Sequence, residues 1–148
     1  MPRRAGGVAI RQSTTEFELQ TRGKRLYEFT DELLTWVRGT GIREGLLTLH
    51  VRHTSASLLI QENADPEVQR DLERFFQRLV PSGDPIFRHT CEGPDDMPAH
   101  VRSALTSTTL SIPVADGRPA LGTWQGTYLY EHRDAPHRRR VVAHIFGE

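Results

Sequence analysis

The chain has 148 residues, of which 36% are hydrophobic, and this length and composition predict a single domain with a small core. Its 19 basic side chains are balanced by 19 acidic ones, so the formal net charge of zero gives no support for attraction to nucleic acid or to an anionic membrane. We therefore expect neither of these partners.

Cysteine usage and hydropathy point to the cytoplasm. The single cysteine, Cys91, excludes a disulfide within the chain and fits a reducing compartment. No apolar run approaches the roughly 20 residues that span a bilayer. The first ten residues lack the apolar core of a signal peptide. We expect a soluble cytoplasmic protein.

The first part of the chain predicts an arm followed by strands and one helix. Residues 1–12 are expected to form a flexible N-terminal arm and residues 13–148 a single domain. Residues 14–21 alternate apolar and polar side chains, as a half-buried strand does. Thr30 is a candidate cap for the helix that follows. The next elements are a strand at 25–29, a helix at 31–39, and strands at 45–53 and 56–62.

The most distinct element is a helix that begins after Asp65-Pro66. Asp65 is a suitable N-cap and proline is favoured at the first helical position, while Pro81 ends the helix. One face of this helix is apolar and the other is charged, as in a helix that packs on a surface. The apolar stripe consists of Val68, Leu72, Phe75, Phe76 and Leu79.

The rest of the chain is rich in strands. Asp95 or Asp96 begins a further helix, because acidic side chains favour its positive end. The predicted elements are a strand at 86–89, a helix at 97–107, and strands at 109–114, 122–133 and 138–148. Helices and strands mix without regular βαβ alternation, which predicts an α+β fold with a mixed or antiparallel sheet and about three helices.

Seven histidines are many for this length, and three of them suggest a metal site. His53 and His89 each end a predicted strand and precede a threonine, whereas His100 lies early on a predicted helix. Ligands of a catalytic metal often come from separate elements, and three imidazoles suit zinc or a similar divalent ion. The chain has no HExxH motif and no CxxC pair, so on spacing alone surface or structural histidines are the favoured interpretation.

Three carboxylates are candidates for acid–base catalysis. Glu62 ends a predicted strand without an evident structural task, and Glu131 follows an alternating aromatic strand. Asp65 already has a sufficient task as a helix cap. Glu62 and Asp65 are expected to share one corner with the "HTS" segment at residues 53–55. Paired carboxylates beside a substrate phosphate make Mg²⁺ an alternative ion.

The segment "LGTWQG" at residues 121–126 is a further dense motif. Its glycines allow close backbone approach, while Trp124 offers a stacking surface and Gln125 an amide. A bulged strand with a packed tryptophan explains the motif equally well. Neither a GxxxxGK[ST] phosphate loop nor a GxSxG elbow occurs, which disfavours the enzymes that use them.

Four segments together resemble the YjbQ-like family, also described as secondary thiamine-phosphate synthases. They are "RHTSASLLIQENADPEVQRDL", "RHTCEGPDDMPAHVRSAL", "IPVADGRPALGTWQGTYLYEHR" and "RRRVVAHIFGE". The resemblance covers nearly the whole chain in unchanged block order. It implies a compact α+β fold that assembles as a homotrimer. It also implies a weak activity that joins hydroxymethylpyrimidine pyrophosphate to thiazole phosphate.

The resemblance also assigns roles to matching positions. His53, His89 and His100 become the leading metal ligands, with zinc or a similar divalent ion as the expected cofactor. The expected catalytic carboxylates are Glu62, Glu131 and Asp65. The expected substrate-binding residues are Thr54, Ser55, Asn63, Arg102, Trp124 and Gln125. Arg102 stands where the family more usually has lysine, so a cation is retained.

Three functions remain open from the sequence. The first is pyrophosphate displacement, in which metal ions and arginines neutralise the leaving group. The second is metal-dependent hydrolysis of a small phosphorylated metabolite, with Glu62 or Glu131 as general base. The third is non-enzymatic binding of a metal or metabolite by a trimer. A tri-histidine site favours zinc, whereas pyrophosphate departure is usually assisted by Mg²⁺, which counts against the first.

Overall fold

A computed structural model describes residues 9–148 and contains two antiparallel sheets and three helices in this range. The strands are β1 (Arg11–Arg22), β2 (Arg25–Glu28), β3 (Gly45–Val51), β4 (Ala56–Glu62), β5 (Thr109–Ala115), β6 (Arg118–Pro119), β7 (Gln125–Glu131) and β8 (Pro136–Gly147). The helices are α1 (Thr30–Thr40), α2 (Pro66–Leu79) and α3 (Asp96–Leu105). The α+β prediction is confirmed.

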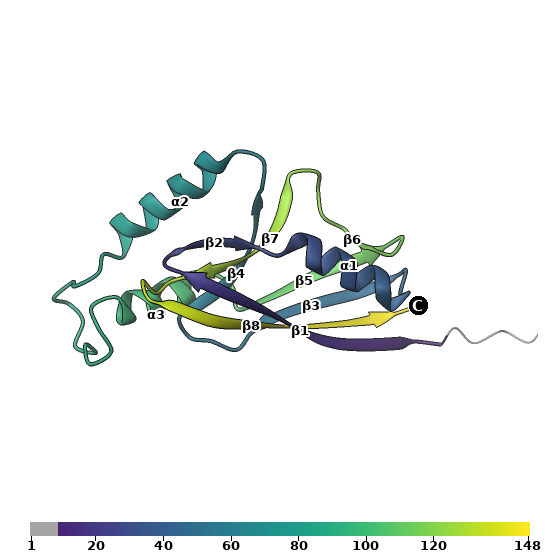
Figure 1. The fold of residues 1–148 in the computed structure, drawn as a ribbon, viewed down its shortest axis with the longest axis horizontal. Helices are drawn as coiled ribbons and strands as arrows, with labels where there is room; N and C mark the ends of the chain where they lie inside the picture. The colour runs from purple at the N-terminus through teal and green to yellow at the C-terminus, as the bar shows by residue number, and fades with distance from the viewer. Residues whose placement is uncertain (1–8) are drawn as a thin grey trace, which may run out of the picture.

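The larger sheet has the order β1-β8-β3-β5-β6 and the smaller one the order β2-β7-β4 (Figure 1). β1 and β8 pair over their full lengths, from Arg11 opposite Gly147 to Arg22 opposite Pro136. The first and last strands of the domain are therefore neighbours, which fixes the C-terminal strand inside the sheet.

The main core lies between the two sheets and α1. Leu33 and Val37 of α1 pack with Leu47 of β3, Ile145 of β8 and Leu129 of β7. Because side chains alternate along a strand, β7 sends its two neighbouring tyrosines, at positions 128 and 130, to the opposite face, where α2 covers them. β7 is thus buried on both faces.

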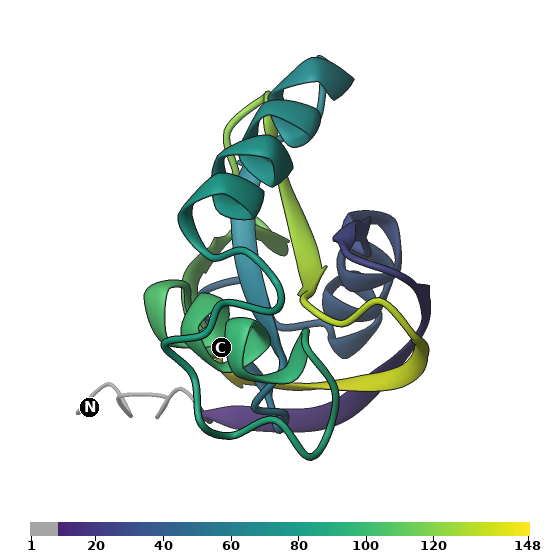
Figure 2. The same ribbon diagram turned by 90° about the vertical axis from the view of Figure 1, so that its left-hand side faces the viewer.

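Helix α2 follows the predicted pattern but is only loosely packed. Asp65 caps it by accepting a hydrogen bond from the Glu67 backbone N–H at 2.9 Å, and Pro66 occupies its first turn, as predicted. No residue of α2 is buried. Phe75 and Leu79 are each about half exposed. Figure 2 shows α2 running along the outside of the molecule beside the small sheet.

Three local predictions differ from the structure. β1 begins at Arg11, so residues 11 and 12 belong to the sheet, and residues 1–8 of the expected arm lie outside the described residues. Residues 86–89 form a loop because Asp84 turns the chain and accepts from the backbone N–H of Ile86. The Thr30 hydroxyl makes no cap and donates instead to Glu28.

Within residues 9–148, no helix has the length and apolar character needed to cross a membrane.

Candidate functional site

Four side chains near the start of α3 bring together ligand atoms suited to a metal ion. His89 and Glu92 come from the loop between α2 and α3, and Asp96 and His100 come from the first turns of α3. Asp96 and His100 are four residues apart, so they share one helix face. One nitrogen or carboxylate oxygen of each residue lies within 4.8 Å of the others. We call these four residues the α3 cluster.

Asp96 is the centre of this cluster. Its Oδ2 lies 2.8 Å from His89 Nε2 and 3.2 Å from His100 Nε2, and its side chain is only 3% exposed. Burial acts to raise the pKa of Asp96, but the hydrogen bond with His89 and the positive charges of His100 and Arg133 lower it below its ordinary value. Asp96 is therefore a carboxylate, with one oxygen turned toward both imidazoles.

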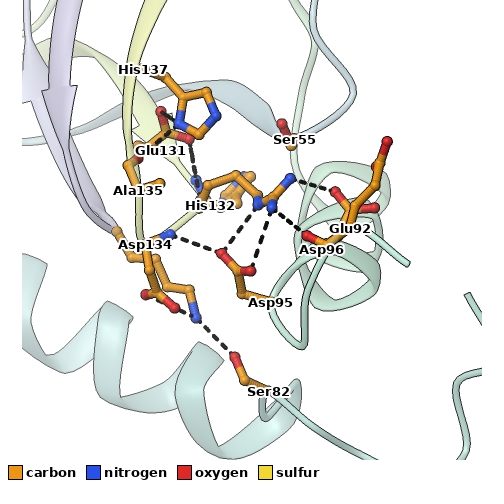
Figure 3. A network of polar contacts seen from close by, with 12 residues as sticks. Ser55, Ser82, Glu92, Asp95, Asp96, Glu131, His132, Asp134, Ala135 and His137 are labelled. Carbon is orange, nitrogen blue, oxygen red and sulfur yellow. Dashed lines mark hydrogen bonds and ion pairs between the residues drawn. The ribbon is translucent and has the colours of Figure 1, made fainter. Parts of the chain in front are cut away.

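Arg133, just beyond the end of β7, donates hydrogen bonds to the α3 cluster and to Asp95 beside it. Its Nη1 donates to Asp96 Oδ1 at 2.7 Å, its Nε donates to Asp95 Oδ2 at 3.1 Å, and its Nη2 donates to the Glu92 carbonyl at 2.8 Å. The backbone N–H of Asp134 adds a bond to Asp95 at 2.9 Å. Figure 3 shows Glu92, Asp95 and Asp96 gathered on one side of this network. The loop that carries two cluster residues is thus fixed to the small sheet.

The donor set decides which ion fits the α3 cluster. Two imidazole nitrogens and two carboxylate oxygens are ligands that zinc accepts, commonly with three protein ligands and one open position at catalytic sites. Mg²⁺ prefers oxygen ligands in octahedral geometry. The two imidazoles are partly exposed, so the cluster is open to solvent. The residues therefore fit a zinc-class ion better than Mg²⁺.

His53, one of the three expected histidine ligands, lies outside the α3 cluster, whereas His89 and His100 are both in it. Its Nε2 accepts the Arg140 backbone N–H at 3.1 Å, beside a hollow of about 340 Å³ that is also lined by Arg52, Arg138 and Glu16. Burial and the charge of Arg139 lower the pKa of His53. The surrounding arginines repel a divalent cation, and Asp96 is the side chain that lies beside His89 and His100.

Glu131, an expected catalytic carboxylate, lies in a buried hydrogen-bond network. It is fully buried and accepts from Arg139 Nε at 2.8 Å, Arg139 Nη2 at 2.6 Å and Thr21 Oγ1 at 2.6 Å, and from two backbone N–H groups. Burial acts to raise the pKa of Glu131, but these bonds lower it. Ser55 Oγ joins this network by accepting from Arg139 at 2.9 Å. A carboxylate with all its acceptor positions filled is a poor general base.

The expected corner around residues 53–65 is divided by strand β4. Ser55 and Glu62 flank or end this strand, so its length holds them roughly 20 Å apart. At the Glu62 end, Asn63 N donates to the Trp124 carbonyl at 2.9 Å, and Gln125 Oε1 accepts from Gly122 N at 2.7 Å. Glu62 Oε2 is buried without a partner among the described residues. Glu62, Asn63, Asp65, Trp124 and Gln125 therefore form a separate group, at the other end of the small sheet from Arg133.

Arg102, an expected substrate-binding residue, is buried between α3 and α2. Its side chain is fully buried, and its Nη1 donates to Glu73 at 2.9 Å, while Tyr130 donates to the same carboxylate at 2.8 Å. Arg102 thus ties α3 to α2. Thr54, another expected substrate contact, is exposed.

Sequence reasoning did not predict Glu92 and Asp96 as members of the α3 cluster, nor the contact of Arg133 with Asp96. Asp96 precedes His100 by four residues on a predicted helix, and this spacing is a usable signal for paired ligands. An acidic side chain at this place is also explained by the helix start, for which Asp95 and Asp96 are both candidates. Arg133 has no local signal, because its contact with Asp96 spans 37 residues.

Comparisons with known proteins place this fold and sequence in a family. Residues 15–148 match the sequence model of the family described as UPF0047 protein YjbQ-like. The chain is 50% identical over 144 residues to the UPF0047 protein sll1880 of Synechocystis, covering 97% of this chain and 98% of the relative. It is 44% identical over 138 residues to the UPF0047 protein YjbQ of Escherichia coli, covering 93% and 98%.

Solved structures share the fold. A YjbQ/UPF0047 family protein from Clostridium acetobutylicum is 32% identical and superposes with a TM-score of 0.80, covering 88% of this chain and 98% of the other. A YbjQ-like protein of unknown function from Sulfolobus solfataricus is 20% identical, with a TM-score of 0.87 and coverage of 95% and 100%. The second likeness is one of fold alone.

Proposed function

The chain belongs to the YjbQ-like UPF0047 family, and on this premise we propose that it is a metal-dependent hydrolase of a small phosphorylated metabolite, with its ion at the α3 cluster. The observation that supports this proposal is the approach of both imidazoles to one buried carboxylate oxygen, at 2.8 and 3.2 Å. Imidazole nitrogens and a carboxylate oxygen are ligands of zinc, and one ion between them would contact all three side chains.

His89, Asp96 and His100 would hold the ion, and Arg133 would orient Asp96. An ion of the zinc class supplies positive charge that neutralises a phosphoryl group and lowers the pKa of water. Glu92 is the most exposed member of the cluster, with 62% of its side chain accessible, and is the proposed general base. It takes a proton from the attacking water as the new P–O bond forms. The proton then passes to the leaving oxygen as the ester bond breaks.

The thiamine-phosphate synthase activity that the family resemblance implies is the weaker proposal for this chain. That reaction releases pyrophosphate, whose departure is usually assisted by Mg²⁺ and by cations. The α3 cluster contains two imidazoles, which favour a zinc-class ion. Arg102, one of the cations expected to assist, is buried against Glu73. Hydrolysis therefore takes precedence.

We also propose that the protein assembles as a homotrimer. The support is helix α2, whose apolar stripe leaves Phe75 and Leu79 about half exposed. Exposed apolar patches on one face commonly mark contacts between subunits. A second copy of the chain offers an apolar surface that would bury this stripe.

The first experiment is elemental analysis of the purified protein without a histidine tag. We expect about one zinc-class ion per chain in the unaltered protein and in His144→Gln, which removes an imidazole outside the cluster. We expect the ion to be lost from Asp96→Asn and His100→Gln. Release of phosphate from p-nitrophenyl phosphate, measured on the same samples, should follow the metal content.

Three results would count against the proposal. Equal metal content in all four proteins would place the ion elsewhere, and absence of metal from the unaltered protein after zinc addition would leave the cluster as a structural ion network. Metal binding without hydrolysis, but with Mg²⁺-supported coupling of the pyrimidine pyrophosphate to thiazole phosphate, would reverse the order of the two proposed reactions.

A further inference from the structure

His89 belongs both to the α3 cluster and to the lining of a neighbouring pocket of about 300 Å³. The lining residue Met97 directly follows Asp96 of the cluster, and the pocket is formed by the loop between α2 and α3 together with the first turn of α3. Figure 1 shows this loop beside α3 at one end of the molecule. A molecule held at the cluster can therefore extend into the pocket.

The loop that forms the pocket is held by hydrogen bonds. Gly83 N donates to the Pro94 carbonyl at 3.1 Å and so joins the two sides of the loop. Arg133 Nη2 donates to the Glu92 carbonyl at 2.8 Å and joins the loop to the end of β7. The pocket is thus formed before a ligand binds, as small-molecule sites usually are.

The wall of the pocket is mainly apolar. Phe87 and Met97 are half-buried, so each retains surface that a ligand can cover, and Pro85 and Pro94 add exposed apolar surface. An apolar cavity of about 150 Å³ is large enough for benzene. A pocket of about 300 Å³ therefore has room for one aromatic ring with its substituents.

The pocket is unsuited to an anionic group. Asp84 is the one acidic residue of the lining, and no lysine or arginine from the described part of the chain lines the pocket. Asp84 Oδ1 accepts from the backbone N–H of Ile86 at 2.9 Å, which holds this carboxylate in place. An anionic group here would be removed from water beside a carboxylate and without a counter-charge. The lining thus favours an uncharged body.

We propose that this pocket receives the organic part of the substrate, and that this part is an uncharged aromatic or apolar body carrying a single phosphate. The inference rests on the proposed function, in which the phosphate lies at the ion of the α3 cluster. The alcohol of the ester then lies against Phe87 and Met97. When water attacks phosphorus and the ester P–O bond breaks, the alcohol leaves with the proton of the attacking water. Phe87 and Met97 determine specificity, because they cover an apolar body and offer a polar one nothing.

Hydrolysis of three matched esters by the zinc-loaded full chain tests this specificity. Benzyl phosphate, 4-carboxybenzyl phosphate and glycerol phosphate all release an alkoxide-type leaving group, so they differ mainly in the body. We expect kcat/KM for benzyl phosphate to exceed the other two at least about tenfold. Phe87→Ala should lower this value about tenfold and change that for glycerol phosphate less than about twofold. Ile86→Ala is the control and should change neither, because Ile86 is 75% exposed and outside the lining.

Methionine labelling distinguishes failure of the pocket from failure of the proposed hydrolysis. The chain has two methionines, Met1 and Met97, so a ¹³C-methyl label places one probe in the pocket of the unaltered protein. Benzylphosphonate, which has no ester bond to hydrolyse, should shift the Met97 methyl resonance with saturation. The 4-carboxy derivative should need a concentration at least about tenfold higher.

The outcomes separate the two proposals. Saturable shifts of the Met97 methyl resonance without turnover of any ester would support the pocket and overturn the hydrolase. Hydrolysis of all three esters with equal kcat/KM would overturn the inference while the hydrolase stands. Absence of a saturable Met97 shift, or equal shifts by the two phosphonates at equal concentration, would also overturn it.

Discussion

Arg133 Nη1 donates to Asp96 Oδ1 at 2.7 Å, while the other oxygen of the same carboxylate faces His89 and His100. One carboxylate thus joins the end of β7 to the proposed metal site, and the arginine fixes which oxygen is left for an ion. Outer contacts of this kind orient ligands and tune their affinity.

Arg133→Met should weaken zinc binding by about 10- to 100-fold, because Asp96 loses its orienting partner while every proposed ligand remains. Competition with a chromophoric zinc chelator measures the affinity. Arg138→Met is the control, since Arg138 pairs with the exposed Glu18 on the edge of the large sheet. Equal zinc affinity in Arg133→Met and the unaltered protein would show that Arg133 does not position the ligands.

Glu92→Gln should separate metal binding from catalysis. We expect the variant to retain its metal, because three ligands remain, and to lose about 10²- to 10⁴-fold in the rate of phosphate release, because the proton acceptor is gone. Glu62→Gln, at the other end of the small sheet, should retain the rate. If Glu92→Gln is fully active while Glu62→Gln is not, the general base lies at the Glu62 end.

The free energy of unfolding should fall in mild acid, because His132 is buried in its neutral form. Its ring is buried, with Nε2 2.8 Å from Ser57 Oγ and Nδ1 unpartnered among the described residues. Burial and the charges of Arg102, Arg139 and Lys24 lower its pKa from 6.5 to about 3. Between pH 3 and pH 6.5 the His132 ring is therefore protonated in the unfolded chain and neutral in the folded chain. The stabilisation is therefore complete above pH 6.5 and declines as the pH falls toward 3.

The expected slope from His132 is about 1.4 kcal/mol of unfolding free energy per pH unit. Urea unfolding between pH 5 and 6.5 measures it, above the range in which carboxylates titrate. His132→Gln keeps a neutral hydrogen-bonding group and should remove this part of the slope. His53 has a lowered pKa too and acts in the same direction, so the difference between the two proteins isolates His132. Parallel pH curves would refute the assignment.

The buried Glu131–Arg139 pair should contribute to the free energy of unfolding and not to the rate of phosphate release. Glu131→Gln leaves Arg139 buried without its counter-charge and should cost about 3–5 kcal/mol of unfolding free energy. The double variant Glu131→Gln/Arg139→Met should lose less than the sum of the single variants, because no lone charge is left. Phosphate release per folded molecule should be unchanged in Glu131→Gln. Loss of turnover at full folding would restore Glu131 to the catalytic residues.

The proposed homotrimer predicts a sedimenting mass of three times 16.8 kDa for the unaltered protein. Leu79→Asp places a charge in the exposed stripe of α2 and should yield a 16.8 kDa species, because a charge cannot be buried there without a partner. Leu105→Asp changes an equally exposed leucine on α3 and should remain trimeric. An unaltered protein that sediments as a monomer would remove the subunit contact.

Local signals in the sequence determined much of the fold. Alternation predicts the strand that became β1, and Asp65-Pro66 with an apolar period of 3.6 predicts α2 and its cap. These features depend on neighbours within a few residues, so a linear pattern records them. The strand prediction at residues 86–89 was wrong because a strand also needs a partner, and none of the strands described within residues 9–148 pairs with that loop.

Tertiary structure alone decided which of the candidate residues meet. His89 and His100 come together because α3 folds back on its own loop, but His53 lies beside β8 among arginines. Glu131 accepts a hydrogen bond from Thr21, which is 110 residues away in sequence. The pairing of β1 with β8 brings Thr21 to this position. Composition and spacing carry no information about such register. They showed which side chains were available for chemistry, and strand pairing and burial determined which of them were left free to perform it.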